Sequence, residues 1–128
     1  MTEKELIEMR KIIMLTLIKI GIRCDLIGFT YLCRAIEHAI LKPDLLHKLC
    51  KKLYVIVGNE YNVQKVNSVE RSMRHAIENA YISNNFSEIN KMFKANVYNK
   101  DEKPTVGGLI KLIVEYYKMG LYKEYITI

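Results

Sequence analysis

The sequence lacks any alternating run of apolar and polar residues long enough to predict a β-strand. It also lacks internal repeats and low-complexity tracts, which argues against a repeat array. What it does have is length and apolar content, because 128 residues, half of them hydrophobic, suffice for one globular domain with its own core. We therefore expect residues 1–128 to form a single all-α domain without a sheet.

Cysteines are few, and Cys24, Cys33 and Cys50 form no CxxC pair. The N-terminus has no short apolar run followed by a small-residue cleavage site. The most apolar stretches, 12–22 and 109–117, each contain a lysine and fall short of the roughly 18 residues that span a bilayer. We therefore expect a protein of the reducing cytoplasm with no membrane segment.

The chain also carries no convincing metal or catalytic motif. Cys33 and His38 lie about 140° apart on a helix and cannot easily chelate zinc together, although His47 and Cys50 could. Gly107 and Gly108 are not followed by the lysine of a phosphate-binding loop, and no nucleophile stands in a recognisable triad pattern. We expect neither a metal nor a cofactor, and not an enzyme, although triads formed only in space remain open.

Apolar residues at helical spacing predict about six helices. Thr2, either Asn67 or Ser68, and Ser87 have side chains suited to cap the starts of three of them. The third and fourth helices, together about 45–82, read as a helix-turn-helix. We also expect the tail, 119–128, to form a helix that packs on the domain or on a second copy. The predicted helices are about 2–20, 29–41, 45–57, 67–81, 86–94 and 106–118.

Basic residues outnumber acidic ones by 20 to 14, which gives a net charge of +6 and favours an anionic partner such as nucleic acid. Many basic proteins bind no nucleic acid, so the placement of the charges must decide. On the helix around 67–81 one side is apolar and the other is a continuous polar arc. The apolar side holds Val69, Met73, Ala76, Ile77 and Ala80, and the polar arc holds Asn67, Glu70, Arg71, Arg74, His75 and Glu78.

Two interpretations of this arc stand side by side. Arginine can fork onto guanine, asparagine can bind adenine and glutamate can accept from cytosine, so the arc has the groups that a helix in the major groove needs. The same arc also fits an ordinary solvated face on which Glu70 and Arg74 form an (i, i+4) pair.

The decisive stretch is VERSMRHAIE at residues 69–78. It resembles the recognition-helix signature V-E-R-x-[IM]-R-H-A-I-E of the C-terminal DNA-binding effector domain of stage-zero sporulation protein A, the master sporulation response regulator of endospore-forming bacteria. Similar residues extend the resemblance from about Ile12 to Tyr117. They include Ile20-Gly21, Gly28-Phe29-Thr30-Tyr31-Leu32, Leu53-Tyr54, Phe93 and Lys103-Pro104-Thr105.

The resemblance implies a six-helix effector domain, winged-helix-like but without a sheet, that binds a short promoter box, often as pairs on adjacent sites. It carries DNA contact over to Glu70, Arg71, Arg74 and His75, to which we add backbone support from Lys65 and Lys103.

Two departures from the family pattern change the expectation. The pair Asn67-Ser68 replaces a family Ser-Arg pair whose arginine reads a base, which should relax or change the preferred sequence. The turn at 63–66 is one residue longer, which should shift the angle of the helix.

Family members also carry an N-terminal receiver, whereas no strand with a phosphoacceptor aspartate precedes the match here. We therefore expect control by abundance, or by competition or pairing with full-length relatives. The family region that matches 83–97 is associated with RNA polymerase sigma factor, but the apolar spacing of Phe86, Ile89, Met92 and Phe93 predicts core. Our leading interpretation is a sequence-specific transcriptional regulator that binds double-stranded DNA. The alternative is a protein-interaction module that forms a homodimer, or a heteromer with a full-length regulator or polymerase.

Overall fold

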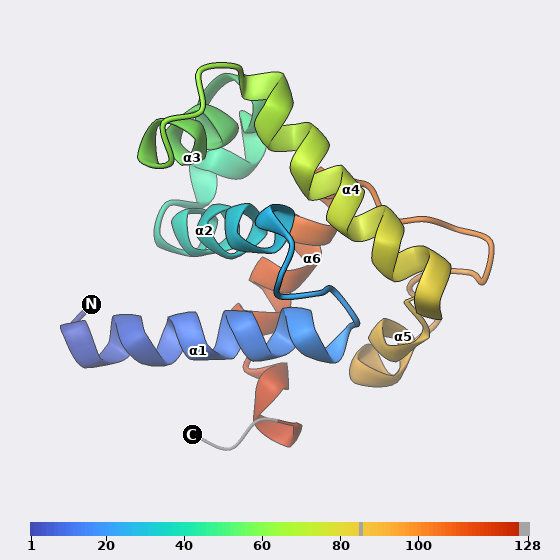
Figure 1. The fold of residues 1–128 in the computed structure, drawn as a ribbon. Coiled ribbons are helices and arrows are strands. Elements are labelled where there is room, and N and C mark those ends of the chain that lie inside the picture. Colours follow the sequence, from blue (N-terminus) through green and yellow to red (C-terminus); the bar gives the residue numbers. More distant parts are fainter. Residues whose placement is uncertain (85, 126–128) are drawn as a thin grey trace.

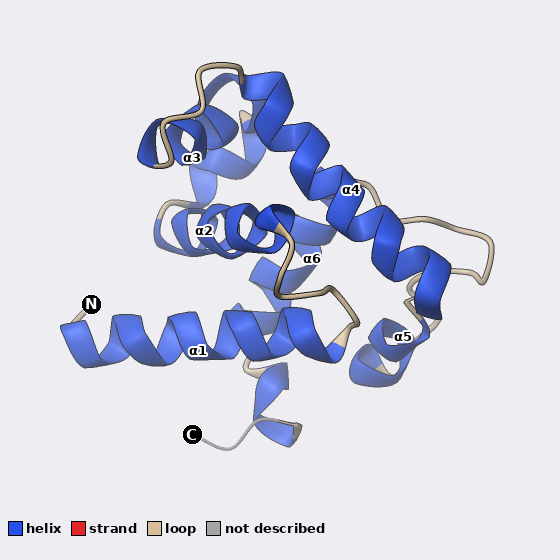
Figure 2. Ribbon diagram, in the orientation of Figure 1, coloured by secondary structure: helices blue, strands red, loops and turns tan. Residues whose placement is uncertain are grey.

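The computed structural model describes residues 1–84 and 86–125, and all regular structure in this part of the chain is helical (Figure 2). The predicted all-α class is confirmed. Three short irregular helices accompany the six α-helices: the 3₁₀ turn η1, the π-type turn η2 and the 3₁₀ turn η3. The elements are α1 (Glu3–Lys19), α2 (Ile27–Leu41), η1 (Pro43–His47), η2 (Leu49–Leu53), α3 (Tyr54–Glu60), α4 (Val66–Asn84), α5 (Ser87–Phe93), α6 (Val106–Lys118) and η3 (Leu121–Glu124).

Helix α1 starts and stops where local chemistry dictates. The amide of Glu5 donates to the Thr2 hydroxyl at 3.1 Å, and the Glu5 carboxylate accepts from the Thr2 amide at 3.2 Å. This reciprocal capping satisfies two amides that the first turn would otherwise leave without partners. At the other end Gly21 takes a φ of 97°, a conformation that glycine adopts without strain. The predicted helix over about 2–20 is confirmed.

Helix α2 lies at the centre and packs against α1, α4 and α6 (Figure 1). Helix α2 approaches α4 very closely at Gly28, where an added Cβ would lie 2.1 Å from the carbonyl oxygen of Ser72. No other glycine in the described residues would bring a Cβ so near to a backbone atom. Only glycine permits two helix backbones to come this near. The core side chains of α2, among them Leu32, Ala35 and Ile36, are fully buried. This packing fixes α4 against the rest of the domain.

The prediction of one helix over 45–57 is wrong, because the chain is broken into η1, η2 and α3. The break falls at Lys48, whose φ of −139° and ψ of 54° are not helical. Beyond it the amides of Lys52 and Leu53 both reach the Lys48 carbonyl, at 2.9 and 3.2 Å. Because these two amides bond to a carbonyl four and five residues back, Lys48 starts a new, wider turn instead of continuing one helix.

Two predicted caps are also wrong. Helix α4 begins at Val66, so Asn67 and Ser68 lie in its first turn, and the Ser68 amide donates to the Lys65 carbonyl at 3.0 Å. The packing of Val66 against the core draws it into the helix. Ser87 is the first residue of α5 rather than its cap, because the residue before it is the fully buried Phe86 in a left-handed conformation.

The C-terminal tail packs on the domain itself as far as residue 125. Helix α6 is followed by η3 rather than by the predicted helix, and the rings of Tyr117 and Tyr122 stack with centroids 5.5 Å apart. The Tyr125 hydroxyl donates to the Lys91 carbonyl at 3.1 Å. Residues 126–128, which belong to the predicted tail helix, lie outside the described residues. The expectation of a core role for Phe86, Ile89 and Met92 is confirmed, since all three are buried.

Candidate DNA-binding surface

Helices α3 and α4 form a helix-turn-helix joined by residues 61–65. Asn62 takes a φ of 58°, and the Val63 amide donates back to the Gly58 carbonyl at 2.8 Å, which closes the turn. A Cβ on Gly58 would lie 3.1 Å from the Val63 carbonyl oxygen and 3.4 Å from Val69. The absence of a side chain at Gly58 therefore lets the turn fold tightly against the start of α4.

Helix α4 has the two faces that its sequence predicts. The five apolar residues assigned to one side, from Val69 to Ala80, are at most 1 % exposed. On the opposite side Asn67, Arg71, Arg74 and His75 are exposed, and Ser68 and Glu70 are half-buried. The structure thus brings six of the predicted contact residues together on one outward face of a helix whose other face anchors it in the core.

Charges on this face are partly paired. The Arg74 guanidinium lies 3.2 Å from a Glu70 carboxylate oxygen and 4.0 Å from one of Glu78. The Lys103 ammonium lies 3.4 Å from Glu78, which brings a residue of the loop before α6 to the edge of α4. Lys65, the last residue of the turn, is exposed at the start of the helix. The surface pair expected between Glu70 and Arg74 is therefore present.

Arg71 and His75 differ from Arg74 because neither forms an ion pair with any residue of the described chain. Together with Ser72 they line a shallow crevice of about 320 Å³ whose other wall is the start of α2, at Ile27 and Gly28. Ile27 is 54 % exposed although it is a large apolar residue. Sequence reasoning missed this neighbour of α4, and the only signal for it was the glycine that allows the close helix crossing.

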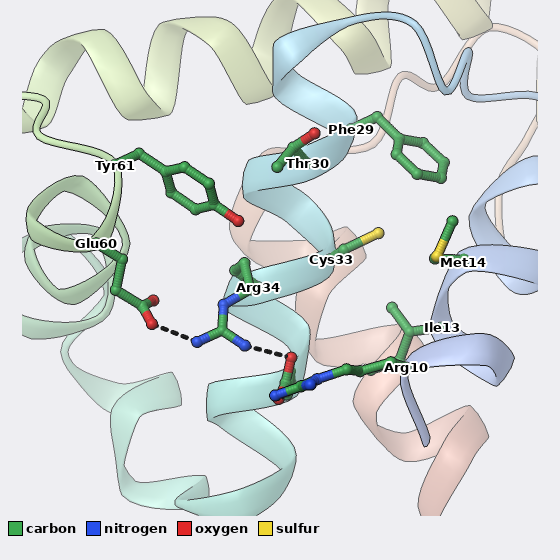
Figure 3. A pocket seen from close by; sticks show the side chains of 10 residues that line it. Arg10, Ile13, Met14, Phe29, Thr30, Cys33, Arg34, Glu60 and Tyr61 are labelled. Atoms are coloured by element: carbon green, nitrogen blue, oxygen red, sulfur yellow. Dashed lines mark hydrogen bonds and ion pairs between the residues drawn. The ribbon is translucent and has the colours of Figure 1, made fainter. Parts of the chain in front are cut away.

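A network of ion pairs holds the end of α3 against α2. The carboxylate of Glu60 accepts hydrogen bonds from the Arg34 guanidinium and lies 2.7 Å from the His38 ring nitrogen. Arg34 also reaches Glu37 at 2.7 Å, and Arg10 of α1 binds the same carboxylate at 3.0 Å (Figure 3). Glu37 is only 4 % exposed, so its charge needs both arginines. The network holds Glu60, the last residue of α3, directly before the turn.

Two groups of this network, Glu60 and Arg34, have shifted pKa values. Partial burial raises the pKa of Glu60, but the hydrogen bonds from Arg34 and His38 outweigh it, and the pKa of this carboxyl lies below its ordinary value of 4.5. The hydrogen bond to Glu60 likewise raises the pKa of Arg34. Both groups therefore keep their charges over the whole physiological range, and the pair persists there.

The ion-pair network forms one wall of a cavity of about 540 Å³ between α1, α2 and the end of α3. The opposite wall is apolar, with Ile13, Met14 and Phe29 (Figure 3). The arginines and carboxylates of the ionic wall already bind one another. The residues that line the cavity come from α1, α2, the end of α3 and the start of the turn, so the cavity lies beside the turn and away from the outward face of α4.

Cysteine and histidine do not gather into a metal site in the described part of the chain, where no group of three or more metal-binding side chains occurs. Burial raises the pKa of the Cys33 thiol to about 12, so it stays protonated, whereas Cys24 and Cys50 are exposed. No helix among residues 1–84 and 86–125 combines the length and apolar character needed to cross a lipid bilayer.

The fold and this surface define an all-helical domain in which two helices joined by a short turn present an outward polar face. A comparison with protein families agrees and is more specific. The family described as "Sporulation initiation factor Spo0A C terminal" matches residues 13–117, which is most of the chain and includes the whole helix-turn-helix. The protein belongs to this family, whose members are DNA-binding regulatory domains rather than enzymes.

Proposed function

We propose that this protein is a sequence-specific transcriptional regulator that inserts α4 into the major groove of duplex DNA in the bacterial cytoplasm. The observation that carries the proposal is the outward face of α4, where Arg71 and His75 are exposed and form no ion pair with the described residues, while the reverse face is buried in the core. A rigid helix behind exposed donors supports base reading, because side chains must reach base edges at fixed positions.

Roles on this surface follow from the chemistry of each group. Glu70, Arg71, Arg74 and His75 divide between base edges and phosphates. Asn67 and Ser68, in the first turn of α4, lie where a second helix of a helix-turn-helix approaches the bases most closely. The ammonium groups of Lys65 and Lys103, at the two edges, suit phosphates as point charges.

The pairing of Arg74 with Glu70 and Glu78 does not oppose this role. Exposed (i, i+4) ion pairs on a helix contribute only about 0.3–0.5 kcal/mol each. A bidentate arginine–guanine contact is worth about 1–3 kcal/mol of discrimination. Losing the two intrahelical pairs would thus cost less than the discrimination that one base contact supplies, and Glu70 would then be free to accept from a cytosine amine.

The test is a fluorescence-anisotropy titration of the whole chain against a duplex carrying the promoter box of the family and against a scrambled duplex, at two salt concentrations. We expect binding to the box about a hundredfold tighter, toward the usual gap between specific and non-specific binding. Equal and steeply salt-dependent binding to both would mean that the target sequence differs, and selection from random duplexes would then find it. Absence of binding to either duplex would refute the proposal.

A second candidate is a protein-interaction module that pairs with a copy of itself, with a full-length regulator or with RNA polymerase through its sigma factor. The observation that favours it is a row of exposed apolar residues on α1, Ile7, Met14 and Ile18, each at least 45 % exposed. These residues recur at helical spacing on one side of α1. A stable heteromer captured from sporulating cells without DNA would favour this candidate.

A further inference from the structure

The recognition helix by itself supplies little electrostatic affinity for DNA. Helix α4 contains two arginines and two glutamates, so it carries no formal net charge when His75 is neutral. Most of the non-specific affinity of DNA-binding proteins comes from cations that neutralise phosphates. If α4 reads bases, another surface of this basic chain must hold the backbone.

The segment that leads into α3 has the required charge. Between residues 42 and 52 the chain has four lysines and a single acidic residue, Asp44, and no further carboxylate follows until Glu60. Lys42, Lys48, Lys51 and Lys52 are all exposed. Within the described residues none of them forms an ion pair, whereas the arginines of α1 and α2 are bound to carboxylates. Their charge is therefore available to a partner.

The irregular backbone of this segment places three lysines within one turn. The Lys52 amide donates to the Lys48 carbonyl at 2.9 Å, so the two residues lie one turn apart along η2, with Lys51 beside them. Leu53 is fully buried and Leu49 packs against Gly107 at the start of α6, which anchors the inner side of the turn. The outer side carries the lysines.

This lysine turn adjoins the helix-turn-helix. Helix η2 continues directly into α3, and α3 packs against α4 (Figure 1). Tyr54, the first residue of α3, is 2 % exposed, so the start of α3 is anchored in the core directly after the lysine turn. In a helix-turn-helix the first helix crosses the DNA backbone while the second enters the groove, so the segment that feeds α3 faces the backbone.

Resting on the proposed function, we propose that Lys48, Lys51 and Lys52 form a phosphate-binding surface that holds the DNA backbone beside the groove read by α4. The duplex presents one negative charge per about 1.7 Å of its axis, so three ammonium groups within one turn can each meet a phosphate. The surface supplies affinity that is independent of sequence, and α4 supplies discrimination.

The test compares two double variants of the whole chain that lose the same charge. One combines Lys51→Gln and Lys52→Gln, and the control combines Lys4→Gln and Lys11→Gln. The control lysines are exposed on α1, on the side of α2 away from α3 and α4 (Figure 1). Each lost phosphate contact lowers the slope of log K against log salt by about 0.9, so the first pair should lower it by about 1.8. The control pair should leave the slope unchanged, and neither pair should alter the ratio of affinities for two duplexes.

An equal change of slope in both pairs, or no change in the first, overturns the proposal while leaving the function of α4 intact. Absence of duplex binding by the natural chain overturns both. Loss of binding to phosphatidylserine vesicles in the first pair, with an unchanged DNA slope, would assign the lysines to a membrane surface instead. As an independent readout, a photocrosslinker on Cys50 in a Cys24→Ser background should label duplex DNA, and failure to label it counts against the proposal.

Discussion

Two stretches of this chain form the proposed DNA-binding surface, and they are built in opposite ways. In α4, two arginines and two glutamates lie on one regular helix, and Arg74 forms ion pairs with Glu70 at 3.2 Å and with Glu78 at 4.0 Å. In the stretch 42–52 the backbone passes through 3₁₀ and π-type turns, and its lysines have no acidic partner in the described structure. The first arrangement is balanced in charge and packed against the backbone of α2, whereas the second has a net positive charge and an irregular backbone.

The difference corresponds to two tasks that compete when one surface performs both. A face with large net charge binds every duplex equally, because phosphates carry no sequence information. A face that reads bases gains from charge balance, since each group then binds well only where its own partner base lies. Separating the two tasks lets α4 discriminate while the neighbouring lysines supply affinity.

The largest expected effect tests the rigid side of this comparison. Gly28→Ala would place a methyl group about 2.1 Å from a backbone oxygen of α4, which cannot move without displacing the helix. We expect a loss of about 3 kcal/mol or more in the free energy of unfolding, at the upper end of overpacking effects. Urea denaturation followed by circular dichroism measures it.

The matched control lies beside the lysine stretch. A Cβ on Gly107 would meet the end of the Leu49 side chain at 2.5 Å, and that flexible side chain can rotate away. Gly107→Ala also gains helix propensity of up to about 1 kcal/mol, so its net effect should be small. Equal destabilisation by both variants would contradict the claim that α4 is held more rigidly than the stretch 42–52.

The next effect concerns base reading by α4. Arg74→Ala should lower discrimination between the preferred duplex and a single-base variant by about 1–3 kcal/mol, which is roughly 5- to 150-fold. Arg74→Lys is the matched control, since it keeps the charge but loses the planar fork, and it should lose discrimination nearly as much. If Arg74→Ala weakens binding to all duplexes equally, Arg74 binds phosphate and the proposed base contact is wrong.

How far the sequence could predict these features depends on how local their causes are. The capping of α1 by Thr2 and Glu5 involves residues three apart, and the buried face of α4 follows from spacing within one helix, so both were predictable. The break at Lys48 was not, because apolar spacing shows which side of a segment is buried but not how its amides are bonded. The Arg34–Glu60 pair joins residues 26 apart and depends on how α2 meets α3.

The Arg34–Glu60 ion pair predicts a smaller effect, a dependence of the stability of the fold on pH. Because the pKa of Glu60 in the folded chain is below its ordinary value of 4.5, the charged carboxylate stabilises the fold. This stabilisation is fully present above pH 4.5 and is lost as the pH falls through the lower pKa of the folded state. When the pH is lowered from 6 to 3, the Glu60→Gln variant should therefore lose less stability than the natural chain. Thermal melts at the two pH values measure this loss.

The smallest effect sharpens the boundary between the two stretches, at Lys65. Lys65 directly precedes α4, so it lies near the arginines of that helix. Its ammonium group is exposed and forms no ion pair in the described chain, as in the lysines of 42–52. Lys65→Ala should weaken binding evenly across sequences and reduce the salt slope by about 0.9, the contribution of one phosphate. Salt titrations on two duplexes measure both quantities. A change confined to one duplex would place Lys65 among the base-reading residues and move the boundary between affinity and discrimination into the turn.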